Sequence, residues 1–293
     1  MPLKRDNLSA LDDPPATPVP AMRRLYDRYF SSHDYKRRYP APNPATLRFL
    51  LTQGQAASSA GILDVGCGDG RYALALLDAT SARITGCDIS GAALAEFAAQ
   101  LQARPDAQRV RLVHGEVKDI APYVPGPEDT RHDLSLLLFG VLSHAGNCHA
   151  RVGMLEAIRR QTTPGGRLLL TVPSIWRRRP VEIVRALWRR ATHRQASHAP
   201  IGDIEFVRMI DGQPQAFFYH LYSVEGLKRE LALAGWTLQS YQAESLLPEW
   251  LVTQHPWVAR LDGLVRPLLP AALGYGIRAV AQPTPGTTDK AAS

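Results

Sequence analysis

The sequence predicts an α/β fold built on a doubly wound, mostly parallel sheet. Short apolar segments alternate five times with helical segments between residues 62 and 172. A glycine-rich turn joins the first apolar segment to the first helix, and an acidic residue, Asp88, ends the second apolar segment. Strands that alternate with helices form parallel sheets, and the ligand crevice of such sheets lies at the carboxyl ends of the strands.

The turn after the first strand is the clearest candidate for a ligand site. Its glycines are Gly66, Gly68 and Gly70. Glycines at alternate positions allow positive φ and remove every Cβ, so a ligand can lie against the main chain and the helix N-terminus. A dinucleotide fingerprint would need a further glycine at position 71, where this chain has Arg71. Because Asp64 would also repel a pyrophosphate, the turn favours a ligand with positive charge over a nicotinamide dinucleotide.

The segment Asp64-Val65-Gly66-Cys67-Gly68-Asp69-Gly70 resembles motif I (D/E-x-G-x-G-x-G) of the class I methyltransferases that use S-adenosylmethionine. Asp88 follows the turn by about twenty residues, where a carboxylate can accept both ribose hydroxyls of a bound nucleoside. Pro164-Gly165-Gly166 before an apolar strand is a frequent mark of the same family. The resemblance covers roughly residues 60–281 and implies a seven-stranded sheet whose last strand, at 274–281, is antiparallel.

The resemblance also implies a site for S-adenosylmethionine. The expected cofactor-binding residues are Asp64, Gly66, Cys67, Gly68, Gly70, Asp88, Ile89, Glu116, Val117 and Phe139. Glu116 stands where many family members carry an Asp that approaches the adenine amino group, and Val117 is the expected packing contact for the ring. No metal is expected, because the pair His144 and His149, with Cys148 between, lacks a third ligand at a suitable spacing.

The implied reaction is an in-line displacement in which an acceptor lone pair attacks the sulfonium methyl group. Such a transfer depends on alignment and on the exclusion of water, and it needs a base only if the acceptor must lose a proton. His144, where the chain leaves the fourth strand, and His220, near the end of an insertion, are the candidate catalytic residues. The alternative for each is a structural, hydrogen-bonded histidine.

The remaining segments are attachments to a single methyltransferase domain at 21–281. Residues 1–20 and 282–293 are expected to be loose tails, and 248–271 a second, apolar and proline-interrupted insertion. Tyrosines and arginines alternate in the first part of segment 21–50, which is interpreted as an N-terminal lid over the cofactor or as surface helices with snorkelling arginines.

The net charge of +7 is concentrated in two segments. Residues 1–50 and 174–222 carry the basic excess, and the rest of the chain is near neutral. This distribution indicates an acidic substrate or surface, or else a solvated basic face. Within the insertion at 173–222, apolar residues recur at helical spacing with arginines on the other side: Val181, Val184, Leu187 and Trp188. This basic helix would lie on an anionic membrane, on an RNA backbone, or over the substrate pocket.

The function predicted from these features is S-adenosylmethionine-dependent methylation of a small-molecule or lipid-like acceptor, which the basic segments suggest is anionic. The alternatives are a tRNA methyltransferase of the wobble-uridine type and a non-catalytic S-adenosylmethionine-binding regulator or partner subunit; hydride transfer is disfavoured by Arg71. An odd number of cysteines and the lack of a run of about 18 apolar residues predict a cytoplasmic protein with reduced thiols, peripheral to the membrane if the basic helix binds there.

Overall fold

The computed structural model describes residues 19–52, 60–120, 131–176 and 202–286, together with Val184 and Trp188. Most of the predicted tails, at 1–18 and 287–293, lie outside the described residues. Most of the predicted basic helix also lies outside them, so its proposed contacts with a membrane, RNA or the pocket stay predictions.

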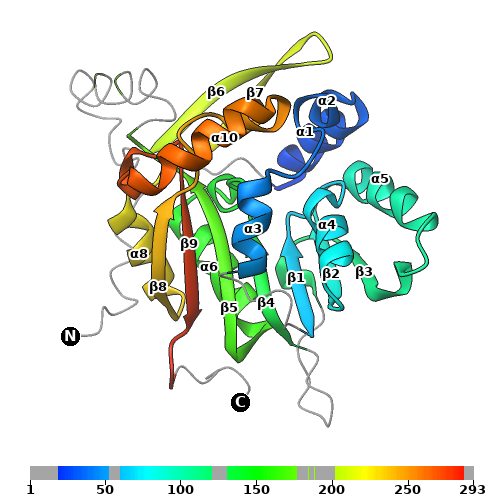
Figure 1. Cartoon of the computed structure of the whole chain (residues 1–293), viewed down its shortest axis with the longest axis horizontal. Helices are drawn as coiled ribbons and strands as arrows, with labels where there is room; N and C mark the ends of the chain where they lie inside the picture. Colours follow the sequence, from blue (N-terminus) through cyan, green and yellow to red (C-terminus); the bar gives the residue numbers. More distant parts are fainter. Residues whose placement is uncertain are drawn as a thin grey trace.

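The centre of the molecule is a seven-stranded sheet (Figure 1). Its strands are β1 (Gly61–Val65), β2 (Arg83–Asp88), β3 (Val110–His114), β4 (His132–Leu137), β5 (Thr162–Pro173), β8 (Trp236–Ala243) and β9 (Gly276–Pro283). They lie in the order β3-β2-β1-β4-β5-β9-β8. The first five are parallel, while β9 runs antiparallel to both β5 and β8. The predicted doubly wound sheet and its antiparallel last strand are therefore confirmed.

Helices cover both faces of this sheet. One face carries α3 (Pro44–Thr52), α4 (Arg71–Ala79) and α5 (Gly91–Gln102), and the other carries α6 (Cys148–Arg160) and α8 (Val224–Leu233). Each face has its own apolar core, centred on residues such as Leu76 and Phe97 on the first face and Leu155 and Leu231 on the second. Side-chain caps begin three of the helices: Ser90 for α5, Asn147 for α6 and Ser223 for α8.

The start of β5 differs from the prediction. A turn was expected at Pro164-Gly165-Gly166, with the strand beginning at Arg167, but the strand begins at Thr162. The pairing with β4 jumps from His132 opposite Thr162 to Leu134 opposite Arg167. The residues between them form an irregularity inside the strand rather than a separate turn.

A two-stranded hairpin inside the 173–222 insertion was not predicted. It consists of β6 (Asp203–Ile210) and β7 (Gln213–His220), joined at Asp211 and Gly212, whose φ angles are 50° and 69°. Positive φ at both central residues is the mark of a type I′ hairpin turn. The inner face of the hairpin packs against helix α1 (Val19–Ser31) in a third apolar cluster. We call α1 and the hairpin together the roof.

The roof lies at one end of the sheet, at the top of Figure 1, beside the short helix α2 (Asp34–Arg38). The expected insertion at 248–271 contains α9 (Glu249–Gln254) and α10 (Pro256–Val265). Short 3-10 helices complete the described chain: η3 (Ala107–Arg109), η4 (Val117–Asp119), η5 (Leu142–His144), η6 (Arg266–Leu268) and η7 (Ala271–Leu273). None of the helices in the described ranges is long and apolar enough to cross a membrane. The three cysteines, all described and buried, form no disulfide.

Candidate active site

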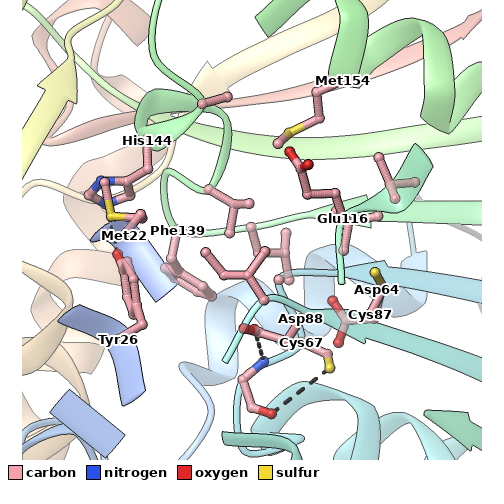
Figure 2. A pocket seen from close by; sticks show the side chains of 18 of the residues that line it. Met22, Tyr26, Asp64, Cys67, Cys87, Asp88, Glu116, Phe139, His144 and Met154 are labelled. Carbon is pink, nitrogen blue, oxygen red and sulfur yellow. Dashed lines mark hydrogen bonds between the residues drawn. The ribbon is translucent and has the colours of Figure 1, made fainter. Parts of the chain in front are cut away.

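A cavity of about 720 Å³ lies between the roof and the carboxyl ends of β1, β2 and β4. Its floor includes Val65, Asp88 and Leu138, which end or follow these three strands. Its volume is in the upper part of the range of small-molecule sites, about 300–1,000 Å³. Figure 2 shows Tyr26 and His144 on one side of this cavity, Glu116 and Met154 on another, and Asp64 and Asp88 near its floor.

The glycine turn is held against the end of β2. The amide of Gly66 donates to the carbonyl of Cys87 at 2.7 Å, and the amide of Gly68 donates to the Asp88 carboxylate at 2.8 Å. Both glycines have positive φ, 73° and 57°. A Cβ at Gly68 would stand 3.1 Å from the ring of Phe30 on α1, so the absence of side chains lets the lid approach the turn closely.

Gly70 is the one expected cofactor-binding residue that does not line the cavity. A Cβ there would overlap the ring of Phe97 on α5. Gly70 instead precedes α4 with a φ of 80°. Its missing side chain serves the packing of two helices, and the other nine residues predicted for the cofactor all line the cavity.

The carboxylate of Asp88 is fixed by two backbone donors. One oxygen accepts from the amide of Gly68 and the other from the amide of Ser90, each at 2.8 Å. Burial raises the pKa of Asp88, and these two amides oppose the rise. Each carboxylate oxygen has a second lone pair, so the fixed group can still accept hydrogen bonds from a pair of ligand hydroxyls.

Asp64 is a buried carboxylate that faces the cavity with 4 % of its surface exposed. No donor among the described residues hydrogen-bonds to its side chain or pairs with it. Burial, with the neighbouring charge of Asp88, raises the pKa of Asp64 to about 7. A cationic ligand would remove this electrostatic cost, so the donor-poor, acidic floor fits a sulfonium or ammonium group.

Glu116 and Val117 line the cavity, and Figure 2 shows Met154 of α6 above Glu116. The Glu116 side chain pairs with Lys118 at 2.5 Å and accepts from the backbone at the start of η4. Val117 is buried against the core. Val117 thus offers an apolar contact and Glu116 a hydrogen-bond acceptor. Both would suit a purine ring, and we propose that they bind the adenine of the cofactor.

His144 lines the cavity and is joined to Tyr26 of α1. Its Nδ1 lies 2.9 Å from the carbonyl oxygen of Phe218, and its Nε2 lies 2.9 Å from the hydroxyl of Tyr26. Because a carbonyl oxygen only accepts, Nδ1 carries the proton in the neutral ring. Nε2 therefore accepts the proton that Tyr26 donates.

His220 lies away from the cavity and has a structural environment. Its Nδ1 pairs with Asp203 across the hairpin, and its ring meets Tyr222 edge-on, with centroids 4.6 Å apart. That ring does not line the cavity, and the catalytic role expected for His220 stays a prediction. Of the two predicted histidines, His144 is the one that borders the site.

His144, Cys148 and His149 are the residues whose spacing could suggest a metal site. His144 and His149 both line the cavity, whereas Cys148 is buried at the start of α6. Within the described ranges, no three His, Cys, Asp or Glu side chains come close enough together to hold a metal ion.

Several cavity residues were missed because the hairpin was missed. They are Phe206, Arg208, Phe217 and Tyr219. The signal that would have found them is the Asp211-Gly212 dipeptide between two segments of alternating apolar residues. A further cavity residue that was not predicted is Glu249 of α9, which pairs with Arg71 at 3.0 Å. This ion pair ties α4 to α9, and the Arg71 guanidinium also lies over the ring of Tyr72, 4.9 Å from its centroid.

A family model described as "Methyltransferase domain" matches residues 62–166. No curated protein matches the chain. Among solved structures, the CcbJ methyltransferase from Streptomyces caelestis is similar, with a TM-score of 0.57 at 14% identity over 83% of this chain and 91% of that chain. The 1,6-didemethyltoxoflavin-N1-methyltransferase from Burkholderia thailandensis has a TM-score of 0.56 at 19% identity over 93% of each chain. The glycopeptide N-methyltransferase MtfA with bound S-adenosylhomocysteine has a TM-score of 0.53 at 16% identity over 84% of this chain and 91% of that chain.

These likenesses concern the fold, while the domain match covers the glycine turn, Asp88 and the first residues of β5. The acidic, donor-poor floor of the cavity is compatible with the cofactor of that family. Residues 62–166 thus match a methyltransferase domain, and the seven-stranded sheet has the fold of class I methyltransferases, which use S-adenosylmethionine.

Proposed function

We propose that this enzyme transfers a methyl group from S-adenosylmethionine to a small-molecule acceptor. The observation that carries the proposal is the roofed cavity, which has two carboxylates on its floor and a hydrogen-bonded tyrosine–histidine pair at its side. S-adenosylmethionine supplies the activated methyl group. Asp64 and Asp88 would hold the cationic and hydroxyl-bearing parts of that cofactor, and the roof would exclude water from the acceptor.

Two comparisons support a small acceptor. The Burkholderia methyltransferase structure contains bound 1,6-didemethyltoxoflavin, and MtfA is named as a glycopeptide N-methyltransferase. In this chain, aromatic side chains of the roof, including Tyr26, Phe206 and Phe217, line the cavity. Such walls suit a flat or apolar molecule better than a nucleic acid backbone.

The Tyr26–His144 pair would serve acceptors that must lose a proton. Burial raises the pKa of Tyr26 well above its ordinary value, although Arg208 opposes the rise, so its phenol is protonated before reaction. The phenol oxygen would take the proton of the acceptor while its own proton moves to Nε2 of His144. The imidazolium formed would stay hydrogen-bonded to the carbonyl oxygen of Phe218.

The experiment that tests the function offers the enzyme S-adenosylmethionine with a labelled methyl group and three fractions of a cell extract: small molecules, lipids and total RNA. We expect label in the small-molecule fraction, and mass analysis of the product would identify the acceptor atom. Label mainly in lipid or in RNA would replace this proposal by a lipid or tRNA methyltransferase. Tight binding of S-adenosylhomocysteine without any transfer would indicate a non-catalytic binding protein.

A further inference from the structure

A single arginine stands on the inner face of the hairpin. On β6 the inward positions alternate with exposed ones, and Ile204, Phe206 and Ile210 on the inner face are buried. Arg208 occupies the remaining inward position and lines the cavity. An arginine in a stripe otherwise built from large apolar residues is an exception to the pattern of an amphipathic strand.

Aromatic rings surround the guanidinium of Arg208. Its central carbon lies 5.3 Å from the ring centroids of both Tyr29 and Phe217, and 5.7 Å from that of Phe206. The two phenylalanine rings are stacked, with an angle of 11° between their planes and 5.4 Å between their centroids. These contacts offset part of the cost of burying a cation, but they supply no hydrogen-bond acceptor for its N–H groups.

The charge of Arg208 has no acidic counterpart among the described residues. Elsewhere in the cavity, Arg71 pairs with Glu249 and Lys118 pairs with Glu116. In the ranges that the structure describes, no carboxylate forms an ion pair with Arg208. A partly buried cation without a counter-ion is costly, and a bound anion would remove that cost.

A second polar group at the same place lacks an acceptor for its proton. The hydroxyl of Tyr29, a residue with 2 % of its surface exposed, lies beside Arg208, which can only donate to its oxygen, and no other described group accepts a hydrogen bond from it. Buried hydroxyl groups are normally hydrogen-bonded, so an unsatisfied one beside a cation indicates a missing acceptor. Arg208 and Tyr29 therefore present unused donors to the same region of the cavity.

We propose that Arg208 and Tyr29 bind a carboxylate of the methyl acceptor, and that the acceptor is a flat aromatic acid. This inference rests on the proposed function and names its substrate class. A planar guanidinium matches a carboxylate in shape and charge, and one cation neutralises a monoanion, whereas a phosphate dianion would need a second cation. The stacked rings of Phe206 and Phe217 supply the apolar wall for the body of the acid.

The carboxylate of the cofactor is the competing ligand for Arg208. Arg71 begins α4 directly after the glycine turn, and Arg38 of α2 also lines the cavity. Arg208 lies instead on the roof, beside Phe217, whose ring meets that of Tyr26 edge-on at 6.1 Å. Arg208 is thus the arginine of the roof that lines the cavity, and Arg38 is an alternative partner for the carboxylate of the cofactor.

The test compares aromatic acids with their neutral amides. Benzoate, 2-naphthoate and indole-2-carboxylate, and the three matching amides, are titrated by calorimetry into protein saturated with S-adenosylhomocysteine. We expect at least one acid to bind roughly 10- to 100-fold more tightly than its amide. Arg208→Met should abolish this preference, Arg208→Lys should retain part of it, and Tyr29→Phe should reduce it. Arg111→Met, which alters an exposed arginine on β3, is the matched control and should change nothing.

The outcomes separate this inference from the proposed function. If no acid binds better than its amide, including the case in which none binds, the inference is wrong. It is also wrong if Arg208→Met weakens the binding of S-adenosylhomocysteine itself, because Arg208 would then belong to the cofactor. Failure of the wild-type protein to bind S-adenosylhomocysteine would instead contradict the proposed function.

Discussion

The buried carboxylate of Asp64 is expected to lower the free energy of unfolding at neutral pH, while its charge favours the binding of a cationic cofactor. Its pKa of about 7 in the folded protein exceeds the value of about 3.9 for an unfolded chain. Between these two values the folded state binds the additional proton, so the free energy of unfolding falls as the pH rises, by about 1.4 kcal/mol for each pH unit. From pH 5 to pH 8 this group alone should remove about 2–3 kcal/mol.

Asp64→Asn should eliminate that loss, because the amide is neutral at every pH and close in shape to the protonated acid. We expect urea unfolding to give similar stabilities for the variant and the wild type at pH 5, and a variant about 2–3 kcal/mol more stable at pH 8. Asp78→Asn changes a side chain that is 65 % exposed on α4 and serves as the control. Parallel stability curves for Asp64→Asn and the wild type would refute the reasoning.

The same carboxylate should link cofactor binding to protons. A cation near Asp64 favours the ionised form, so binding near pH 7 should release a proton. Calorimetry of S-adenosylhomocysteine binding in buffers of different ionisation enthalpy measures that release directly. Asp64→Asn should bind roughly 10- to 100-fold more weakly and release no proton from this site. Proton release that is equal in the variant and the wild type would assign it to another group.

Four further substitutions test the site and its surroundings. Asp88→Asn replaces one of two fixed acceptor oxygens and should weaken S-adenosylhomocysteine binding by roughly 10- to 100-fold in calorimetry, so unchanged affinity would refute its role. Gly140→Ala should cost more than about 2 kcal/mol in urea unfolding, because φ is 80° and the new methyl group would overlap the hydroxyl of Tyr219. Gly212→Ala has a similar φ of 69° but open space around the new methyl group, so it should cost only about 1 kcal/mol. Equal losses of stability in the two variants would show that the overlap with Tyr219 is not the cause at Gly140. Once the acceptor is known, Tyr26→Phe should lower kcat by about 10²–10⁴-fold with unchanged cofactor affinity if that acceptor loses a proton, whereas unchanged kcat would remove Tyr26 from the proton path.

The sheet could be predicted because its signals are local. Each buried strand is a short apolar run, and the glycine turn and Asp88 mark the ends of two of them. The roles of Gly70 and His220 could not be predicted in this way. They depend on Phe97 and Asp203, whose positions beside them are set by tertiary packing rather than by sequence spacing.

The hairpin was missed for a different reason. The arginines of the insertion indicate a basic helix, whereas the hairpin is indicated only by the alternation of apolar residues on either side of Asp211. Arg208 lies on the inner face of the hairpin, where it meets Tyr29 of α1, a residue about 180 positions earlier in the chain. No pattern within one segment indicates such a meeting, so the anion-binding pair of Tyr29 and Arg208 becomes visible only in three dimensions.

The third apolar cluster is built almost entirely from α1 and the hairpin, and it is separate from the two cores that hold the sheet together. Substitutions in this cluster therefore leave the packing beneath the cofactor intact. Changes in the roof can therefore alter the wall of the cavity while both cores of the sheet keep their packing. An opening of the cavity at the roof would be less costly than a movement of the sheet, because the roof has its own small core.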